Sequence, residues 1–249
     1  MDHTTMLVNL LKLHFGWHLA RLKCLASIIV ALFKIKTVHL TEVATAFPGT
    51  AEMGSHDKRL QRFCKQVESK PSLIATCVVA FLPYETSPLS MDRTNGMLGC
   101  FHSNFLVLSV GHEGIAFPVL WLFLQKKGNA KTEERMPLID RFIDIFGVEK
   151  LDGLFGDREC IGETWFAYVQ THHIKLCIRI KSDRHLSRTH GILAPASHFF
   201  RSLPVGTSWA FGGPRLVCGQ RRWVTGGRLH SGAYLMIVSN YPSDTVLDD

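Results

Sequence analysis

The longest apolar stretch of the chain, NFLVLSVGHEGIAFPVLWLFL at positions 104–124, most constrains how the chain can fold. A helix of that length could cross a bilayer. His112 and Glu113, however, stand between two glycines in the middle of the stretch, which is a turn signal. The apolar residues on each side have the length of fully buried strands. The stretch therefore predicts a hairpin of two buried strands in a globular protein, with no membrane partner.

Strand and helix patterns alternate around this hairpin, from Leu89 to about residue 182. A strand pattern, PLSMDRTN, precedes the hairpin, and an amphipathic helix, a strand, a helix and a strand follow it (TEERMPLIDRFIDIFG, DGLFGD, GETWFAYVQTHH, IKLCIRIK). The inward face predicted for the first helix consists of Met136, Ile139, Phe142, Ile143 and Phe146. The order β-β-β-α-β-α-β predicts an α/β fold with a ribonuclease-H-like core, a mixed sheet in which the first and fourth strands are neighbours.

Residues 1–85 are predicted to be helical, because apolar residues recur at spacings of three and four. Two short helices, HLTEVATAF and HDKRLQRFCKQV, flank the helix-breaking segment PGTAEMG. Ser55 is a suitable N-cap for the second helix, with Asp57 in its first turn. Its inward side is predicted to hold Leu60, Phe63, Cys64 and Val67. Two short helices around a turn resemble a helix-turn-helix DNA reader.

The second of these helices also carries a row of basic residues, Lys58, Arg59, Arg62 and Lys65. Such a face can contact the phosphates of double-stranded DNA, but an ordinary solvated helix face has the same composition. The formal net charge of +7 suits a polyanionic partner and is also found in basic proteins that bind no nucleic acid.

The tail of the chain changes character again, with short strand patterns separated by glycine-rich turns (TSWAF, PRLVCG, RRWVTGGRL and AYLMIVS). We therefore expect three domains: helical DNA-binding residues 1–85, a catalytic core at 86–182, and a β-rich insertion at 183–249.

The seven cysteines are scattered, odd in number and never spaced as C-x-x-C. This pattern indicates reduced core thiols rather than a disulfide framework or a zinc ribbon. Together with an N-terminus that does not resemble a secretory signal, it predicts a cytoplasmic protein associated with the nucleoid.

Asp92 and Asp157 each follow or end a predicted strand of the core. If the first and fourth strands are neighbours, the two carboxylates project together at one end of the sheet. Carboxylates so placed can hold Mg²⁺ or Mn²⁺ ions that activate an attacking oxygen and stabilise the leaving oxygen of a phosphodiester. The alternative is that each aspartate forms a turn or caps a helix, as Asp157 would for the helix that follows it.

Four blocks of the sequence, LSMDRTN, the long hairpin segment with its continuation QKKGNAKTEER, GDRECIG and IRIK, resemble those of bacterial insertion-sequence transposases of the Asp-Asp-Glu type, in the family numbered four. The resemblance runs over essentially the whole chain. It implies that Asp92 and Asp157 are the first two catalytic, metal-binding acids. It also implies an N-terminal DNA-binding region and an insertion between the second acid and the third. Arg158, beside Asp157, is a further candidate for a phosphate contact.

The chain departs from the family pattern at three points. Gly96 stands where the family has Trp, and Cys160 stands where it has an aromatic residue. No glutamate follows Glu163, so the Tyr-Arg-Glu-Lys segment that carries the third acid is missing, and the sequence ends in SDTVLDD.

We therefore expect a transposase truncated at its C-terminus, whose relatives bind the terminal repeats of their element and cut and join DNA. Whether this chain is an active enzyme is left open by the sequence. The expected partners are double-stranded DNA and either a second copy of the chain or an intact transposase. A catalytically dead DNA-binding remnant that inhibits intact transposase is one alternative. A ribonuclease-H-like nuclease is another.

Overall fold

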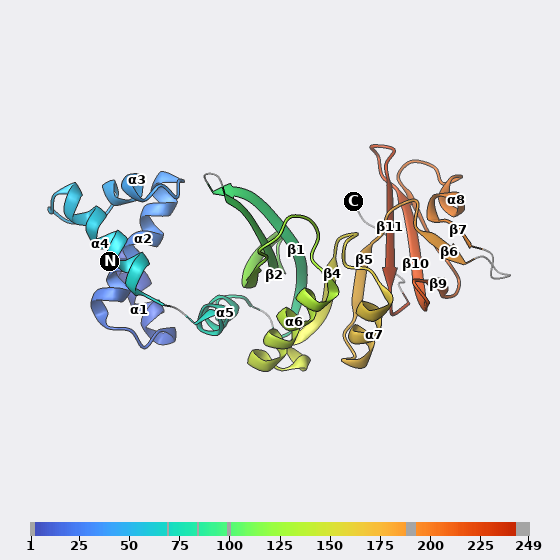
Figure 1. The fold of residues 1–249 in the computed structure, drawn as a ribbon, viewed down its shortest axis with the longest axis horizontal. Helices are drawn as coiled ribbons and strands as arrows, with labels where there is room; N and C mark the ends of the chain where they lie inside the picture. Colours follow the sequence, from blue (N-terminus) through green and yellow to red (C-terminus); the bar gives the residue numbers. More distant parts are fainter. Residues whose placement is uncertain (1–2, 69, 84, 99–100, 188–192, 243–249) are drawn as a thin grey trace. The chain divides into compact units, whose positions relative to one another are not determined.

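The computed structural model describes residues 3–68, 70–83, 85–98, 101–187 and 193–242. The chain divides into two compact units, Met1–Phe81 and Leu82–Asp249, which are treated separately below (Figure 1). Within the described residues, no helix combines the length and the apolar character that a membrane crossing requires.

The first unit consists of helices, as the apolar spacing predicts: α1 (His3–His14), α2 (Leu19–Ile35), α3 (Leu40–Thr45), α4 (Met53–Gln66) and α5 (Pro71–Ala80). Two small clusters of buried side chains hold it together. In one, residues of α1 and α5 pack on α2 around Leu22. In the other, α3 and α4 pack on α2 around Leu60, which is fully buried.

The start of α4 differs from the prediction. The helix begins at Met53 with Glu52 as its N-cap, so Ser55 and Asp57 lie inside the helix. Asp57 there accepts a hydrogen bond from Nε2 of Gln61, one turn later, at 2.8 Å. Because the helix begins earlier than predicted, Gly54 continues it instead of breaking it.

The buried face of α4 also differs in part from the predicted one. Cys64 is exposed, although it was placed on the inward side with Leu60. His56, which was not expected on the inward side, is buried. Its ring lies edge-on to the ring of Phe47, with 5.7 Å between the centroids. A histidine that packs on an aromatic ring can serve as a core residue, which a strict polar-versus-apolar pattern misses.

The second unit is built on a mixed sheet. Its first strands are β1 (Ser87–Leu98), β2 (Phe101–His112), β3 (Ile115–Phe123), β4 (Leu151–Gly156) and β5 (Leu176–Arg179). Helix α6 (Thr132–Phe146) and the short 3₁₀ helix η1 (Val148–Lys150) lie between β3 and β4, and α7 (Glu163–Thr171) lies between β4 and β5. The β2–β3 hairpin turns at Glu113 and Gly114, both with positive φ, so the predicted hairpin is confirmed. The prediction that both strands are buried is wrong for β3, an edge strand in which Val119 and Leu120 are buried but Ile115 and Phe123 are exposed.

The strand order β3-β2-β1-β4-β5 confirms the ribonuclease-H-like fold class. β1 pairs antiparallel with β2 and parallel with β4, and β4 pairs parallel with β5. The first and fourth strands are therefore neighbours, as the order of elements predicts.

The tail does not form a separate β-rich domain, which corrects the predicted insertion. Strand β11 (Tyr234–Ser239) pairs antiparallel with β5, and β10 (Gln220–Arg228) and β8 (Thr207–Ala210) follow it, so one sheet runs from the core into the tail. Strand β9 (Arg215–Val217) also pairs antiparallel with β10. The remaining shorter elements are β6 (His185–Ser187) and β7 (Leu193–Pro195), which form a two-stranded sheet, and α8 (Ala196–Phe200). The free edge of β5 explains the continuity, because an unpaired edge offers backbone groups to the next strand.

The inward face predicted for α6 is only partly buried in the structure. Ile139 and Phe142 are buried, whereas Met136, Ile143 and Phe146 are only half-buried. The remaining buried positions are Leu138 and, unexpectedly, Arg135. An arginine therefore occupies a core position of the helix that covers the sheet.

The described cysteines are all free thiols, and Cys24, Cys77 and Cys160 are buried as predicted. Cys64 is exposed, and Cys177 and Cys218 are half-buried. Cys100 lies outside the described residues.

Candidate active site

Asp92 and Asp157 lie next to the point where two neighbouring strands stop pairing. The parallel pairing of β1 with β4 ends at the partners Met91 and Gly156; Asp92 is the next residue of β1, and Asp157 is the first residue after the end of β4. Neighbouring strands are about 4.8 Å apart. Both aspartates line one cavity of about 180 Å³ between the sheet and α6. The structure therefore brings together the two acids that the sequence singles out.

Asp157 does not cap the helix that follows it. Helix α7 begins at Glu163 with Gly162 as its N-cap, and the backbone carbonyl of Asp157 instead accepts a hydrogen bond from the N–H of Cys160 at 2.8 Å. The Asp157 side chain is 57% exposed, with Nε of Arg158 3.8 Å from its Oδ1. The carboxylate is therefore open to solvent and carries no capping role for α7.

Asp92 is held in a fixed orientation by its own strand. The N–H of Arg93 donates to Oδ1 of Asp92 at 2.7 Å. Beyond Met91, β1 remains paired with β2 but no longer with β4. Asp92 thus sits where β1 loses one neighbour, which leaves room beside its carboxylate.

The turn after β4 is tied to β1 by an ion pair. Nε and Nη2 of Arg93 donate to the two carboxylate oxygens of Glu159 at 3.3 and 3.2 Å. Nη1 of Arg93 donates to Oδ1 of Asn95 at 2.6 Å. The side chains of Arg93 and Glu159 are only 18% and 31% exposed, and a two-bonded arginine–carboxylate pair is geometrically specific. The pair holds the segment that carries Asp157 against the strand that carries Asp92.

Arg135 is a site residue that the sequence analysis missed. It lines the cavity with the two aspartates although it is 96% buried (4% exposed). Its Nη2 donates to the carbonyl of Ala130, and its guanidinium lies 6.0 Å from the centroid of the Trp165 ring. The sequence gives one signal for its burial. Arg135 lies three positions before Leu138 and four before Ile139, so it falls on the apolar stripe of α6.

Cys160 closes the floor of the same cavity. Burial raises the pKa of its thiol to about 11, and the nearby Arg135 only partly opposes this. At neutral pH the thiol therefore stays protonated, and a protonated thiol is a poor metal ligand. A side chain at Gly156 would collide with Cys160, which explains why the strand ends in glycine before Asp157.

The oxygen donors of this cavity are the carboxylates of Asp92 and Asp157, a kind of ligand that Mg²⁺ and Mn²⁺ prefer. Glu159 also lines the cavity, but its carboxylate is engaged by Arg93. Across the described ranges, no set of three or more His, Cys, Asp or Glu side chains is arranged to hold a metal ion.

The predicted DNA-binding residues lie in two different units. Lys58, Arg62 and Lys65 are exposed on α4 at spacings of four and three, which places them on one outer face of the helix. Arg59 is also exposed but borders a cavity with Lys23 and Ser27 of α2, so it turns toward α2. Arg158 belongs to the second unit, beside Asp157.

Comparison with known proteins gives little further information. No protein-family model and no curated protein matches the chain. Among solved structures, the chain is similar to a cryo-EM structure described as the piggyBac transposase synaptic complex with hairpin DNA, at 9% sequence identity and a TM-score of 0.43. The match covers 94% of this chain and 54% of that one, so the chain spans about half its length. Likeness at this level establishes neither a family nor a function.

Proposed function

We propose that the chain is a transposase-type protein that binds double-stranded DNA and holds a divalent cation between Asp92 and Asp157 for phosphoryl transfer. One observation carries the proposal: the parallel register of β1 and β4, which ends at Met91 and Gly156 and so places the two acids side by side. The resemblance of LSMDRTN and GDRECIG to insertion-sequence transposases supports the narrower substrate, the terminal repeats of such an element and its target DNA.

Each site residue has a definite part in this proposal. When bound, a divalent cation activates the attacking oxygen and stabilises the leaving oxygen of the phosphodiester. Asp92, oriented by the N–H of Arg93, and the exposed Asp157 supply its oxygen ligands. Arg158 contributes a positive charge next to Asp157, where it would contact a phosphate of the DNA.

Arg135 would set the charge balance of the cavity. Its guanidinium is a positive charge in the lining that also holds Asp92 and Asp157, and two neighbouring carboxylates repel one another less beside such a charge. In this proposal Arg135 is a positioning residue rather than a ligand.

A second candidate function is a DNA-binding protein without catalysis, which would act by competing with an intact transposase. The engagement of Glu159 by Arg93 favours it, because the cavity then offers two carboxylates rather than three. Two-metal chemistry needs enough anionic ligands to hold both ions against their mutual repulsion.

Binding of Mn²⁺, followed by its electron paramagnetic resonance signal, tests the site. We expect Asp157→Asn and Asp92→Asn each to abolish binding, because one carboxylate competes poorly with water for a dication. Asp152→Asn is the matched control, since Asp152 is an exposed aspartate on the same strand, paired only with Lys175 at 3.3 Å. Mn²⁺ binding that survives both site variants would remove the cation from the proposal.

Cleavage of labelled double-stranded DNA in Mg²⁺ or Mn²⁺ separates the two candidate functions. Cutting that is lost in Asp157→Asn supports the enzyme. DNA binding and Mn²⁺ binding without any cutting support the non-catalytic protein.

A further inference from the structure

The basic residues of this chain are concentrated in one stretch. Residues 175–242 contain ten Lys and Arg and a single acid, Asp183, whereas the rest of the chain contains eighteen Lys and Arg and twenty acids. The excess positive charge of the chain therefore comes entirely from this stretch, which forms β5 to β11. A region with so one-sided a charge attracts polyanions.

Several arginines of this region have structural tasks within it. Arg215 lies over the ring of Phe211 at 4.4 Å, and Arg228 lies 5.7 Å from the ring centroid of Tyr234. Arg222 is buried and donates to the backbone carbonyl of Phe166 at 3.3 Å. These three side chains are engaged by the fold itself, so they do not explain the charge excess as a binding surface.

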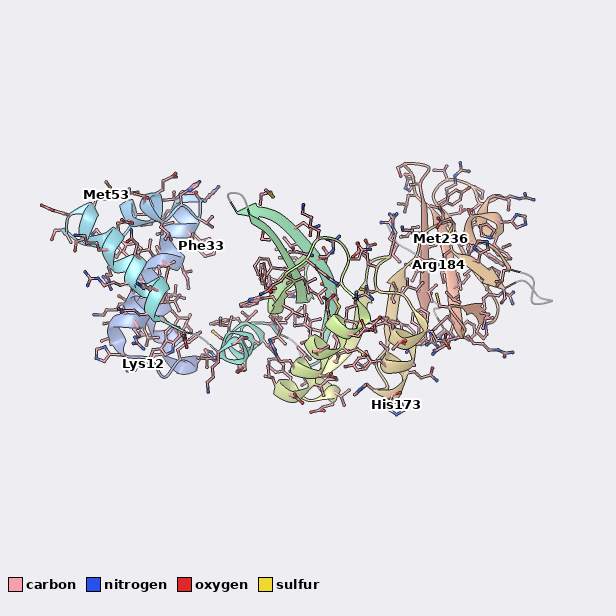
Figure 2. All side chains as sticks on the ribbon, viewed as in Figure 1. Lys12, Phe33, Met53, His173, Arg184 and Met236 are labelled. Atoms are coloured by element: carbon pink, nitrogen blue, oxygen red, sulfur yellow. The ribbon has the colours of Figure 1, made fainter. Side chains whose placement is uncertain are left out.

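Two other basic side chains are not engaged in this way. Lys181 and Arg184 form no ion pair and no side-chain hydrogen bond with any part of the chain that the structure describes. Arg184, which is labelled in Figure 2, is nevertheless half-buried. Placing a guanidinium in a partly buried position without a partner costs free energy, and an anionic ligand would supply the missing partner.

Lys181 and Arg184 line the same cavity, of about 550 Å³, together with His185 and one acid, Asp183. Its far wall is the β9–β10 turn, where Cys218 and Gly219 both have positive φ. The walls are fixed by backbone hydrogen bonds. The N–H of Leu216 donates to Oγ of Ser187 at 2.8 Å, and the N–H of Ala196 donates to the carbonyl of Arg184 at 2.8 Å. These hydrogen bonds hold the backbone around the cavity, while most of the side chains that line it are exposed to solvent.

We infer that this cavity is a second DNA-binding site, which holds the phosphodiester backbone of double-stranded DNA through Lys181 and Arg184. Among the described residues, no Phe, Tyr or Trp lines the cavity, so it offers no large aromatic platform on which a base could stack. Lys181 and Arg184 outnumber the one acid of the lining, Asp183, and suit contact with backbone phosphates, which position DNA without reading its sequence. Arg201 and Arg221, both exposed in the same region, extend the positive field beyond the cavity. The inference rests on the proposed function only in taking DNA as the partner.

The test is fluorescence anisotropy of labelled double-stranded DNA with the full chain, over a series of NaCl concentrations. We expect Lys181→Ala combined with Arg184→Ala to weaken binding about tenfold near 0.1 M salt and to reduce the salt slope by about two units, one for each lost phosphate contact. The matched control combines Lys127→Ala with Arg141→Ala, which removes two exposed charges from the part of the same unit that precedes residue 175. The control should bind within about twofold of the original chain.

The outcomes separate this inference from the proposed function. Suppose that the original chain binds DNA and that the two double variants lose the same DNA affinity, or lose none. The cavity is then not a DNA-binding site, although the chain still binds DNA elsewhere. If the original chain shows no salt-dependent binding at all, both the cavity and the proposed function fall.

Lysine acetylation of the unaltered chain gives a readout that does not depend on the folding of a variant. DNA should protect Lys181 from the reagent, as measured by mass spectrometry, while the exposed Lys127 reacts equally with and without DNA. Equal labelling of Lys181 under conditions where DNA is bound would also overturn the inference.

Discussion

The two halves of the second unit share one sheet but have opposite charge. Residues 82–174, which carry β1 to β4, contain twelve acids and eight Lys and Arg. Residues 175–242 contain one acid and ten Lys and Arg. Strand β5 opens the basic half and pairs with β4 on one side and β11 on the other. One continuous sheet therefore joins an acidic part and a basic part.

The difference also shows in how each half uses its charged residues. In the acidic half, Arg93 and Glu159 pair with one another, and Lys126 pairs with Glu134 at 2.7 Å. In the basic half, arginines have almost no acids to pair with and instead lie on aromatic rings or bind carbonyl oxygens. Most of the positive charge of the basic half is therefore not neutralised by acids within that half.

The largest expected effect comes from breaking the contact between the two halves. Phe166 of α7 is fully buried, and the guanidinium of Arg222 on β10 lies 4.6 Å from its ring centroid. We expect Phe166→Ala to lower the free energy of unfolding by about 3–5 kcal/mol, because it leaves a large cavity in the core. Urea unfolding followed by circular dichroism measures the loss.

Phe123→Ala is the control for this substitution, since Phe123 is 47% exposed on the edge strand β3. Phe123→Ala should lower the free energy of unfolding by clearly less than Phe166→Ala. If both substitutions lower it by the same amount, the two halves do not share a core at Phe166.

A smaller effect is expected inside the basic half. Gly226 of β10 is buried, and a Cβ at this position would overlap with the ring of Phe200. Phe200 is itself fully buried, so the ring cannot move without disturbing its neighbours. We expect Gly226→Ala to destabilise the chain by about 1–3 kcal/mol, as overpacked cores do. Gly212→Ala, where no atom lies near the added Cβ, should change stability far less.

Much of this unit could be predicted from the sequence, because its signals are local. The turn at His112 and Glu113, the strand that ends at Asp157 and the glycine-rich turns of the tail all follow from short patterns. The adjacency of Asp92 and Asp157 followed from the order of elements, since that order implies which strands are neighbours.

What could not be predicted depends on contacts distant in sequence. The pairing of β11 with β5 joins residues about sixty positions apart, and no local pattern specifies it. Arg135 was missed because a polar residue on an apolar stripe is usually placed outside, and its partner Trp165 lies on another helix. His56 was missed for the same reason, because its buried place depends on Phe47.

A moderate effect is expected at the ion pair of the acidic half. We expect Arg93→Ala to lower the free energy of unfolding by about 1 kcal/mol, because the pair is partly shielded from water and forms two bonds. It should also weaken Mn²⁺ binding, since the segment that carries Asp157 loses its tie to β1. Glu159→Gln tests the same contact from the other side. Mn²⁺ affinity that is unchanged in both variants would show that the tie does not position Asp157.

The smallest expected effect on stability comes from the helical unit. Lys58, Arg62 and Lys65 are exposed on one face of α4 and take part in no ion pair with the described residues. Replacing all three with Ala should therefore change the free energy of unfolding by less than about 0.5 kcal/mol.

If this face of α4 contacts DNA, the same triple substitution should reduce the salt slope of DNA binding by roughly one unit for each lost contact. The combination of Lys12→Ala, Lys34→Ala and Lys36→Ala removes the same charge from α1 and the end of α2, and it serves as the control. A loss confined to the α4 variant would make α4 a phosphate-binding face alongside the basic half of the sheet. If both variants lose the same salt slope, α4 contributes only net charge. The basic half of the sheet would then remain as the proposed phosphate-binding surface.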